Sequence, residues 1–208
     1  MDKIELPARI INKQISVGYV FQKRTSCRNF DKKPLTLQQL SNILWTGQGV
    51  IGGSFNMRRT TPSAGASFPL EVYMAVRKEG VNGIAQGIYQ YLPEEHGLLK
   101  IYAKDVTKEL VESCYQQQFM ESAGINIVIA ADFEKTRQRY ADRGERYVYM
   151  EAGSTAQNIY LEVVELGLGT VMVGAFDDAA VKSIFGLDKY TPIAVMPVGM
   201  PKDKKLYA

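Results

Sequence analysis

The chain has 208 residues, of which 46% are hydrophobic and 10% aromatic, so it carries enough apolar material for a packed globular core. Its formal net charge is only +3, which argues against a nucleic-acid binder that relies on bulk positive charge. No apolar run approaches the roughly 20 residues that cross a bilayer, and the charged N-terminus does not resemble a secretory signal. With only Cys27 and Cys114, a disulfide scaffold is excluded and a reducing cytoplasm is favoured. We therefore expect one cytoplasmic domain over residues 1–208, with no membrane and no nucleic-acid partner.

The first half of the chain predicts two capped helices. Ser16 is a candidate N-cap for a short helix over residues 17–23. Thr36 is followed three residues later by Gln39, which is a capping-box pattern. The apolar stripe of a second helix follows it, formed by Leu37, Leu40, Ile43 and Leu44.

A long loop and the first strands come next. Residues 47–67 are rich in Gly, Ser, Thr and Arg and predict a loop of a length that is often functional. Apolar residues alternate from Leu70 to Val76, which predicts a strand. The segments GIYQYL and LLKIYA then predict a hairpin.

The single histidine, His96, excludes much chemistry. Any Ser-His-Asp or Cys-His hydrolase would need it as the base, and it cannot form a His-rich metal site with two distant cysteines. Its context, LPEEHGLL, is typical of a turn, so we interpret it as a plain surface residue. No metal site is expected, and the reactive atoms of an enzyme with this sequence would belong to a cofactor.

The second half predicts an alternation of helices and strands. We expect a helix over residues 107–119, a strand over 125–131, and a long helix over 145–166 that Gly167 ends. A strand TVMVG, a short helix opened by Asp177 or Asp178, and a last strand PIAVMPVGM complete the chain. This order predicts an α+β fold with a mixed sheet flanked by helices.

Three segments have compositions suited to chemistry. Arg24 and Arg28 flank Thr25 and Ser26, and two guanidinium groups beside hydroxyls suit a phosphate monoester. The same five residues also suit a solvated surface loop, so the pattern alone leaves both interpretations open.

The second segment, RRTTPSAGASFPLEVY, has two prolines that stiffen a loop of small residues. Such a loop can lie against a ring system, or it is an ordinary turn before a strand. The third, GLGTVMVGAFDD, has a strand ending at Gly174 where backbone amides become free. Such amides can stabilise the reduced ring of a flavin; the alternative is a simple helix-strand-helix connection.

Taken together and in this order, the segments resemble the nitroreductase superfamily of FMN-dependent oxidoreductases, most closely its SagB-type dehydrogenase branch. The matching pieces are RTSCRNF, RTTPSAGASFPLEVY, RYADRGERYVYMEAGSTAQN, GLGTVMVGAFDD and MPVGMP, so the likeness runs from about Ser16 to Pro201. The resemblance implies an α+β nitroreductase-like fold with a central, mainly antiparallel sheet. It also implies an intertwined homodimer with two FMN sites at the interface.

The resemblance assigns roles residue by residue. The phosphate and ribityl chain of FMN would be bound by the first segment, the ring would lie on the second, and backbone amides near N5 would come from the third. Gln117 would reach the cofactor from the partner chain, with Gln116 or Gln118 serving if the register shifts. The cofactor-binding residues so implied are Arg24, Thr25, Ser26, Arg28, Pro62, Ser63, Ala64, Gly65, Gln117, Gly174, Ala175, Lys204 and Lys205. The two terminal lysines are otherwise part of a solvated tail.

Two departures from the branch affect the expected reaction. The branch often reads EAGH in its long helix, whereas this chain has EAGS from Glu151 to Ser154. Azoline-oxidising members carry a Lys-Tyr pair where this chain has Arg139 and Tyr140, which we take as the candidate catalytic residues. Arginine stays charged and is a poor proton acceptor, so azole synthesis is disfavoured.

Three functions remain open. The first is an FMN oxidoreductase that transfers hydride from NAD(P)H to a small aromatic acceptor such as a nitroaromatic or a quinone. The second is a tailoring dehydrogenase that oxidises a substrate such as a peptide azoline, with Tyr140 near the chemistry. The third is a flavin-binding module with little turnover, since a binding protein needs the same cradle.

Overall fold

A seven-strand antiparallel path forms the centre of the molecule. The computed structural model describes residues 2–12, 14–52, 58–204 and 206–207. The strands lie in the order β1 (Lys3–Glu5), β7 (Gly97–Tyr102), β6 (Gly87–Leu92), β5 (Leu70–Val76), β8 (Ile125–Ala131), β10 (Thr191–Pro201) and β2 (Phe30–Asp31), and β9 (Gly169–Thr170) also pairs with β10. Every named pair of strands in this sheet is antiparallel. The mixed sheet expected from the order of elements is therefore wrong, and the mainly antiparallel sheet that the resemblance implied is confirmed.

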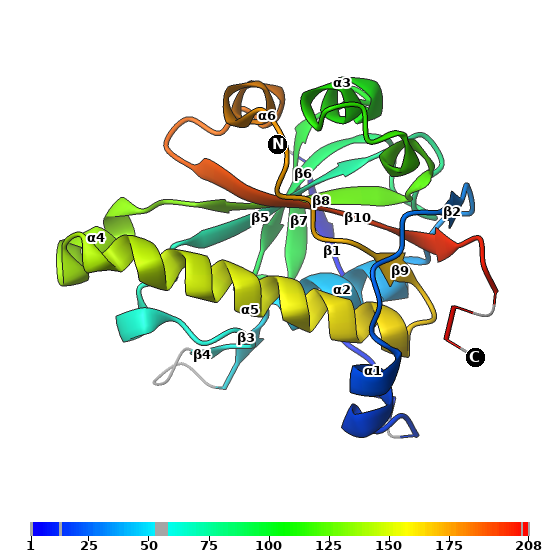
Figure 1. Ribbon diagram of the computed structural model, residues 1–208, viewed down its shortest axis with the longest axis horizontal. Helices are drawn as coiled ribbons and strands as arrows, with labels where there is room; N and C mark the ends of the chain where they lie inside the picture. Colours follow the sequence, from blue (N-terminus) through cyan, green and yellow to red (C-terminus); the bar gives the residue numbers. More distant parts are fainter. Residues whose placement is uncertain (1, 13, 53–57, 205, 208) are drawn as a thin grey trace.

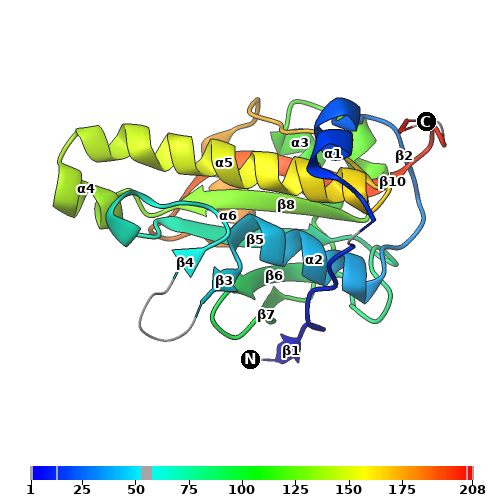
Figure 2. The ribbon, with the colours of Figure 1, turned by 90° about the horizontal axis from the view of Figure 1, so that it is seen from below.

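Helices cover both faces of the sheet (Figures 1 and 2). On one face lie α2 (Leu37–Gln48) and the long α5 (Arg143–Glu165); on the other lie α3 (Thr107–Ser113) and α6 (Asp178–Phe185). The short α1 (Val17–Lys23) packs on α5, and α4 (Glu134–Tyr140) leads into it. Three smaller elements are β3 (Val50–Ile51), β4 (Arg58–Arg59) and the 3₁₀ turn η1 (Ala64–Ala66), and a second 3₁₀ turn, η2 (Gln118–Ser122), follows α3.

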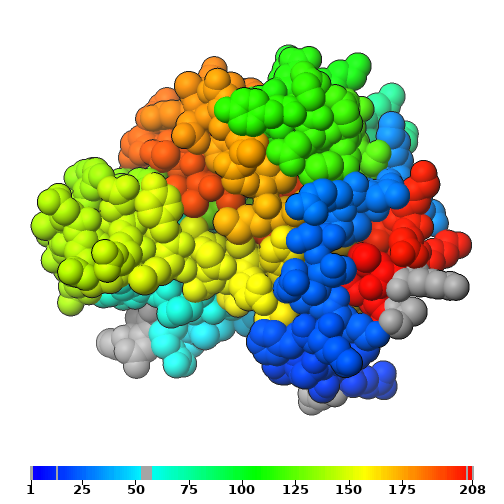
Figure 3. Space-filling view, in the orientation of Figure 1, coloured from blue at the N-terminus to red at the C-terminus, as the bar shows by residue number. Residues whose placement is uncertain are grey.

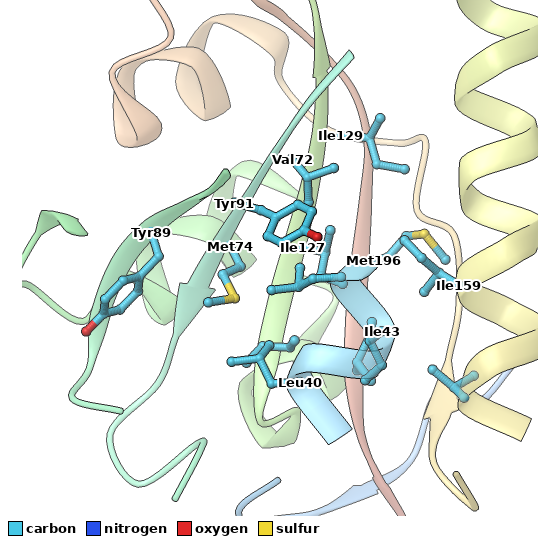
Figure 4. Close-up of a cluster of buried hydrophobic side chains, with 14 of the residues drawn as sticks. Leu40, Ile43, Val72, Met74, Tyr89, Tyr91, Ile127, Ile129, Ile159 and Met196 are labelled. Atoms are coloured by element: carbon cyan, nitrogen blue, oxygen red, sulfur yellow. The ribbon is translucent and has the colours of Figure 1, made fainter. Parts of the chain in front are cut away.

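Two apolar layers result because the central strands are buried on both faces. In β8, Ile127 and Ile129 pack toward α2 and α5, whereas Val128 and Ala130 pack toward α3 and α6. Figure 4 shows the first layer, where side chains from α2 and α5 meet those of the strands. Its labelled members include Leu40, Ile43, Met74, Ile127, Ile159 and Met196. This layer fixes α5, which carries Tyr160 and Glu151 of the candidate site.

The capped helices and the main strands agree with the sequence predictions. Ser16 accepts a hydrogen bond from the Tyr19 amide, and Thr36 and Gln39 form the complete capping box. Asp177 caps α6 by accepting from the Ala180 amide, which decides between the two candidate aspartates. The strands over 70–76 and 125–131 and the hairpin are present, as is the long helix. No helix in the described ranges is long and apolar enough to cross a membrane.

Other boundaries were predicted wrongly. Around residues 47–67, α2 extends to Gln48, and β3, β4 and η1 follow it; residues 53–57 lie outside the described part. The helix expected over 107–119 ends at Ser113, because Tyr115 and Gln116 adopt positive φ angles that no helix continues. The strand TVMVG pairs only at Thr170 and, by an isolated bridge, at Val173. The sequence did not predict β1, β2 or α4.

His96 is not a plain surface residue. Its Nε2 lies 2.8 Å from the Ser41 hydroxyl and 3.1 Å from the Pro7 carbonyl oxygen, and its Nδ1 lies 2.9 Å from the Tyr91 hydroxyl. The N-terminal segment pairs with β7 and folds over this turn, so the imidazole is half-buried. Desolvation accordingly lowers the pKa of His96 below its ordinary value. Its role in the structure is to attach the N-terminal segment to α2.

Candidate functional site

Tyr160, on α5, joins two of the segments that the sequence singled out. Its hydroxyl lies 3.2 Å from the Ser26 hydroxyl and accepts a hydrogen bond of 2.7 Å from the Met172 amide. The guanidinium carbon of Arg24 lies 5.4 Å from the centroid of the Tyr160 ring. The Cys27 amide donates to the Thr170 carbonyl oxygen at 2.8 Å. The arginine-rich segment and the 170–175 segment therefore form one cluster, which we call the cation–amide cluster (residues 24–28, Tyr160 and 170–175).

The cation–amide cluster has groups that can bind an anion. Arg24 and Arg28 form no ion pair with any residue the structure describes, and Arg28 is exposed. The backbone N–H groups of Gly174 and Ala175 likewise have no acceptor among the described residues. A Cβ added at Gly174 would meet nothing within 4 Å, so the backbone there faces open space. Two guanidinium groups without an ion pair and two backbone amides without an acceptor are donors that suit a phosphorylated planar ligand.

Other predicted residues lie at the edges of this cluster. Gln117 donates from Nε2 to the Ala175 carbonyl oxygen at 3.2 Å, within the same chain, so its role across a dimer interface stays a prediction. Thr25 is half-buried, and Gln116 and Gln118 are exposed and bond to each other. The tail that carries Lys204 packs nearby, because Leu206 contacts the Cys27 cluster and Tyr19 donates to the Tyr207 carbonyl oxygen. Lys205 lies outside the described residues.

A second cluster, which we call the loop–α4 cluster (Pro62–Gly65, Arg139 and Tyr140), forms around Gly65. Arg139 Nη1 donates to the Gly65 carbonyl oxygen at 2.8 Å. A Cβ at Gly65 would lie 2.6 Å from the Tyr140 hydroxyl, so the phenol rests against this backbone. The Tyr140 ring packs edge-on to Tyr147, with centroids 5.0 Å apart. Both candidate catalytic residues therefore lie against the small-residue loop that was predicted to line a ring.

Glu151 is a buried carboxyl beside the loop–α4 cluster. It is 3% exposed, and its Oε1 has no hydrogen-bond partner. Burial raises the pKa of Glu151 to about 7, against the opposing influence of the Ser63 hydroxyl and the positive charges of Arg59 and Lys135. Both cations are paired elsewhere: Arg59 with Glu94 at 2.9 Å and Lys135 with Glu71 at 3.5 Å. Glu151 therefore keeps its proton to a higher pH than an exposed carboxyl does.

The two clusters lie on opposite sides of α5. Glu151 and Tyr160 are nine residues apart, which at about 100° per residue places them half a turn apart around the axis. Gly153 shares the Tyr160 face, and a Cβ there would meet nothing within 4 Å. Thr155 and Asn158 lie on the Glu151 side and bond to Thr61. Figure 1 agrees: β4 and the chain after it lie on one side of α5, and the chain between β9 and α6 lies on the other.

Sequence reasoning found most members of these clusters and missed the residues that hold them. Tyr160 was overlooked because it reads as one more large residue of an amphipathic helix. Glu151 was noted only as part of a motif. Its signal was available, since a carboxylate directly before the small residues Ala152 and Gly153 lies within a buried helix face.

The fold and these clusters define a member of a known class. The nitroreductase family model matches residues 21–200, so the chain belongs to the nitroreductase family. The family indicates an oxidoreductase. The resemblance to its SagB branch also holds, because relatives of that kind are found by sequence and by structure.

Individual relatives are similar over most of their length. MJ1384 of Methanocaldococcus jannaschii, named as a nitroreductase without an established activity, is 44% identical over 186 residues, covering 89% of this chain and 91% of that protein. The microcin B17-processing protein McbC of Escherichia coli is 29% identical over 204 residues, covering 94% and 74%. A crystal structure of a nitroreductase homologue from Ralstonia eutropha JMP134 superposes with a TM-score of 0.83 at 27% identity, covering 97% and 90%.

Proposed function

We propose that this chain is an FMN-dependent oxidoreductase that transfers hydride from NAD(P)H to a small, flat aromatic acceptor such as a nitroaromatic or a quinone. The observation that carries the proposal is the cation–amide cluster, where Tyr160 contacts Arg24, Ser26 and the Met172 amide and so joins the arginine-rich segment to the segment with free backbone amides. The arginines suit a flavin phosphate and the backbone amides suit a flavin ring edge. The cluster occurs in a chain of the nitroreductase family. Two free thiols, Cys27 and Cys114, agree with the proposed cytoplasmic location.

The donor set fits FMN. Arg24, Ser26 and Arg28 would hold the phosphate and ribityl chain, with Thr25 and the Lys204 tail beside them. The free amides of Gly174 and Ala175 would face the ring edge, where donors stabilise negative charge on reduction. Bound FMN would supply the two-electron redox chemistry, while the protein orients the reactants and excludes water.

The loop–α4 cluster would form the other wall of the site. Pro62, Ser63, Ala64 and Gly65 present small side chains and backbone to a flat ligand, with Arg139 and Tyr140 behind Gly65. Within one chain this wall lies across α5 from the cation–amide cluster. A complete site would therefore combine the wall of one protomer with the cation–amide cluster of its partner.

Exposed apolar residues support such a homodimer. Phe21 on α1 is 58% exposed and Met150 on α5 is 60% exposed, and Val17 and Met172 are also exposed. Their elements, α1, α5 and the 170–176 segment, lie together on the face shown in Figure 3. Large apolar side chains gathered on one face mark an interaction surface.

An anaerobic titration tests the proposal. The purified protein, loaded with FMN, is titrated with NADH and then with NADPH while the visible flavin band is followed. Rapid bleaching of the flavin band by either coenzyme supports the proposed reductase activity. A yellow protein that neither coenzyme bleaches refutes the nicotinamide-driven reaction and leaves the flavin-binding module or the tailoring dehydrogenase. Failure to take up FMN refutes the whole proposal.

A tailoring dehydrogenase is the second candidate, because Arg139 and Tyr140 occupy a defined place and the chain is similar to McbC. In this case the Tyr140 hydroxyl would hold or move a proton of the substrate. Tyr140→Phe should then lower turnover of an azoline-like substrate by about 10²-fold, the usual scale of general acid–base catalysis. Unchanged turnover with every accepted substrate would remove that role, and Tyr147→Phe is the matched control from the same ring pair.

A further inference from the structure

Tyr160 has one hydroxyl and two polar neighbours. Chemistry fixes the direction of the hydrogen bond with the Met172 amide, and burial of Tyr160 favours one direction for the bond with Ser26. The Met172 amide can only donate, so the Tyr160 oxygen is its acceptor at 2.7 Å. Tyr160 is 9% exposed, so its own hydroxyl hydrogen needs an acceptor within the protein. The Ser26 oxygen, 3.2 Å away, is the acceptor that the described residues offer.

This arrangement also fixes Ser26. Because the Ser26 oxygen accepts from Tyr160, the serine directs its own hydrogen away from the tyrosine. Ser26 is exposed, so that hydrogen can point to the space outside the cluster, on the same segment as Arg24 and Arg28. A hydroxyl that accepts one hydrogen bond is polarised and donates more strongly. The hydrogen bonds from the Met172 amide to Tyr160 and from Tyr160 to Ser26 form a donor series, which ends in the outward-facing Ser26 hydroxyl.

The ligand that Ser26 favours depends on whether its hydroxyl presents a hydrogen or a lone pair to the outside of the cluster. A phosphate presents only acceptor oxygens, so a hydroxyl hydrogen beside two guanidinium groups adds to its binding, whereas a lone pair would repel it. An unphosphorylated ligand gains much less, because it has no charge at this position.

We infer that Tyr160 is a positioning residue that makes Ser26 a hydrogen-bond donor toward a phosphate monoester, and that it thereby sets the preference of this site for a phosphorylated over an unphosphorylated flavin. The inference rests on the proposed function, since it takes the cation–amide cluster as the phosphate site. Arg24, stacked on the same ring, is held in place by the aromatic face and not by the hydroxyl. Tyr160→Phe therefore removes the donor series and leaves the arginine contact.

The experiment measures dissociation constants of FMN and of riboflavin for the flavin-free protein by quenching of flavin fluorescence. Tyr160→Phe keeps the Ser26 hydroxyl but removes the hydrogen bond that orients and polarises it, so we expect FMN binding to weaken by about fivefold. Riboflavin binding should change by less than about twofold, because the affected group faces only the phosphate. The control is Tyr89→Phe on β6. It removes another tyrosine hydroxyl, which donates to the Ala85 carbonyl oxygen at 2.9 Å. It should leave both constants unchanged.

Ser26→Ala is the second variant, and it keeps the Tyr160–Met172 bond. It should show the same selective loss of FMN, and the double variant should lose no more than Ser26→Ala alone, because Tyr160 acts through Ser26. Equal weakening of both flavins in Tyr160→Phe would show a merely structural role and overturn the inference. An unchanged FMN preference in Ser26→Ala would overturn it even if Tyr160→Phe failed to fold. Wild-type protein that binds no FMN would instead refute the proposed function.

Discussion

Arg139 donates a hydrogen bond to the carbonyl oxygen of Gly65, 2.8 Å away, across 74 residues of chain. Gly65 has a φ of 59°, a left-handed conformation that L-residues rarely adopt. The turn that lifts the Gly65 carbonyl toward Arg139 therefore depends on glycine. The helix that carries both candidate catalytic residues is attached to the loop at this point.

Gly65→Ala is expected to destabilise the fold more than a glycine replacement without a close neighbour. An alanine at this φ has a strained backbone, and its Cβ overlaps the Tyr140 hydroxyl and Arg139. We expect the overlap to lower the free energy of unfolding by about 1–3 kcal/mol beyond the backbone strain. Gly83→Ala is the control, because Gly83 has a φ of 80° with nothing within 4 Å of the added atom, and it should cost about 1 kcal/mol. Urea unfolding measures both. Equal losses would mean that Arg139 and Tyr140 do not contact the loop in solution.

Arg28→Glu is expected to abolish retention of FMN. The change replaces the proposed phosphate donor with a charge that would repel the phosphate, which we expect to weaken binding by at least about 100-fold. The flavin-to-protein absorbance ratio after gel filtration measures occupancy. Lys108→Glu makes the same change of charge at an exposed residue of α3 and should keep the flavin. Normal occupancy in Arg28→Glu would refute the phosphate-site assignment.

Glu151 predicts a decline of stability with rising pH. Its pKa is about 7 in the folded chain and near the ordinary 4.5 when unfolded. Between these values the folded state binds more protons, so its stability falls as pH rises from about 4.5 to about 7. The total loss is about 3 kcal/mol at most. Glu151→Gln cannot ionise and should lack this part of the pH dependence. Parallel pH profiles of unfolding free energy in wild type and variant would show that the carboxyl is not held protonated.

Phe21→Asp is expected to yield monomers. Phe21 is exposed in the single chain and would be covered in the proposed homodimer. A carboxylate placed there is costly to desolvate, so the proposed association should fail. Sedimentation velocity over a range of concentrations measures the mass, and FMN occupancy should fall with it if each site spans two chains. Tyr102→Asp is the control, since this tyrosine is also exposed but lies on β7. A wild-type chain that sediments as a monomer throughout would contradict the homodimer.

Local sequence patterns predicted the elements whose causes are local. The caps at Ser16 and Thr36 depend on residues three positions away, and the alternation in β5 reflects the side chains that enter one apolar layer. The end of α3 was missed because Tyr115 and Gln116 adopt positive φ angles, which their residue types do not favour. The sheet order was missed because β8 lies between β5 and β10 through contacts far apart in sequence.

The candidate site shows the same division. Arg24, Ser26, Gly65 and Gly174 were singled out by residue type, because cations, hydroxyls and glycines indicate their use directly. Tyr160 and Glu151 have ordinary residue types for a helix, and only their partners distinguish them. His96 was misjudged because the residues that bury it, Pro7 and Ser41, are distant in the chain.

The interval from Glu151 to Tyr160 sets both the distance between the two clusters along α5 and the angle between them around its axis. Both clusters contact the same helix, so Glu151 and Tyr160 are about 13 Å apart along its axis and half a turn apart around it. One residue inserted in this interval would rotate Tyr160 by about 100° and carry its hydroxyl away from both Ser26 and Met172. Surface loops elsewhere in the molecule can lengthen at small cost, but the length of this nine-residue interval is fixed by geometry.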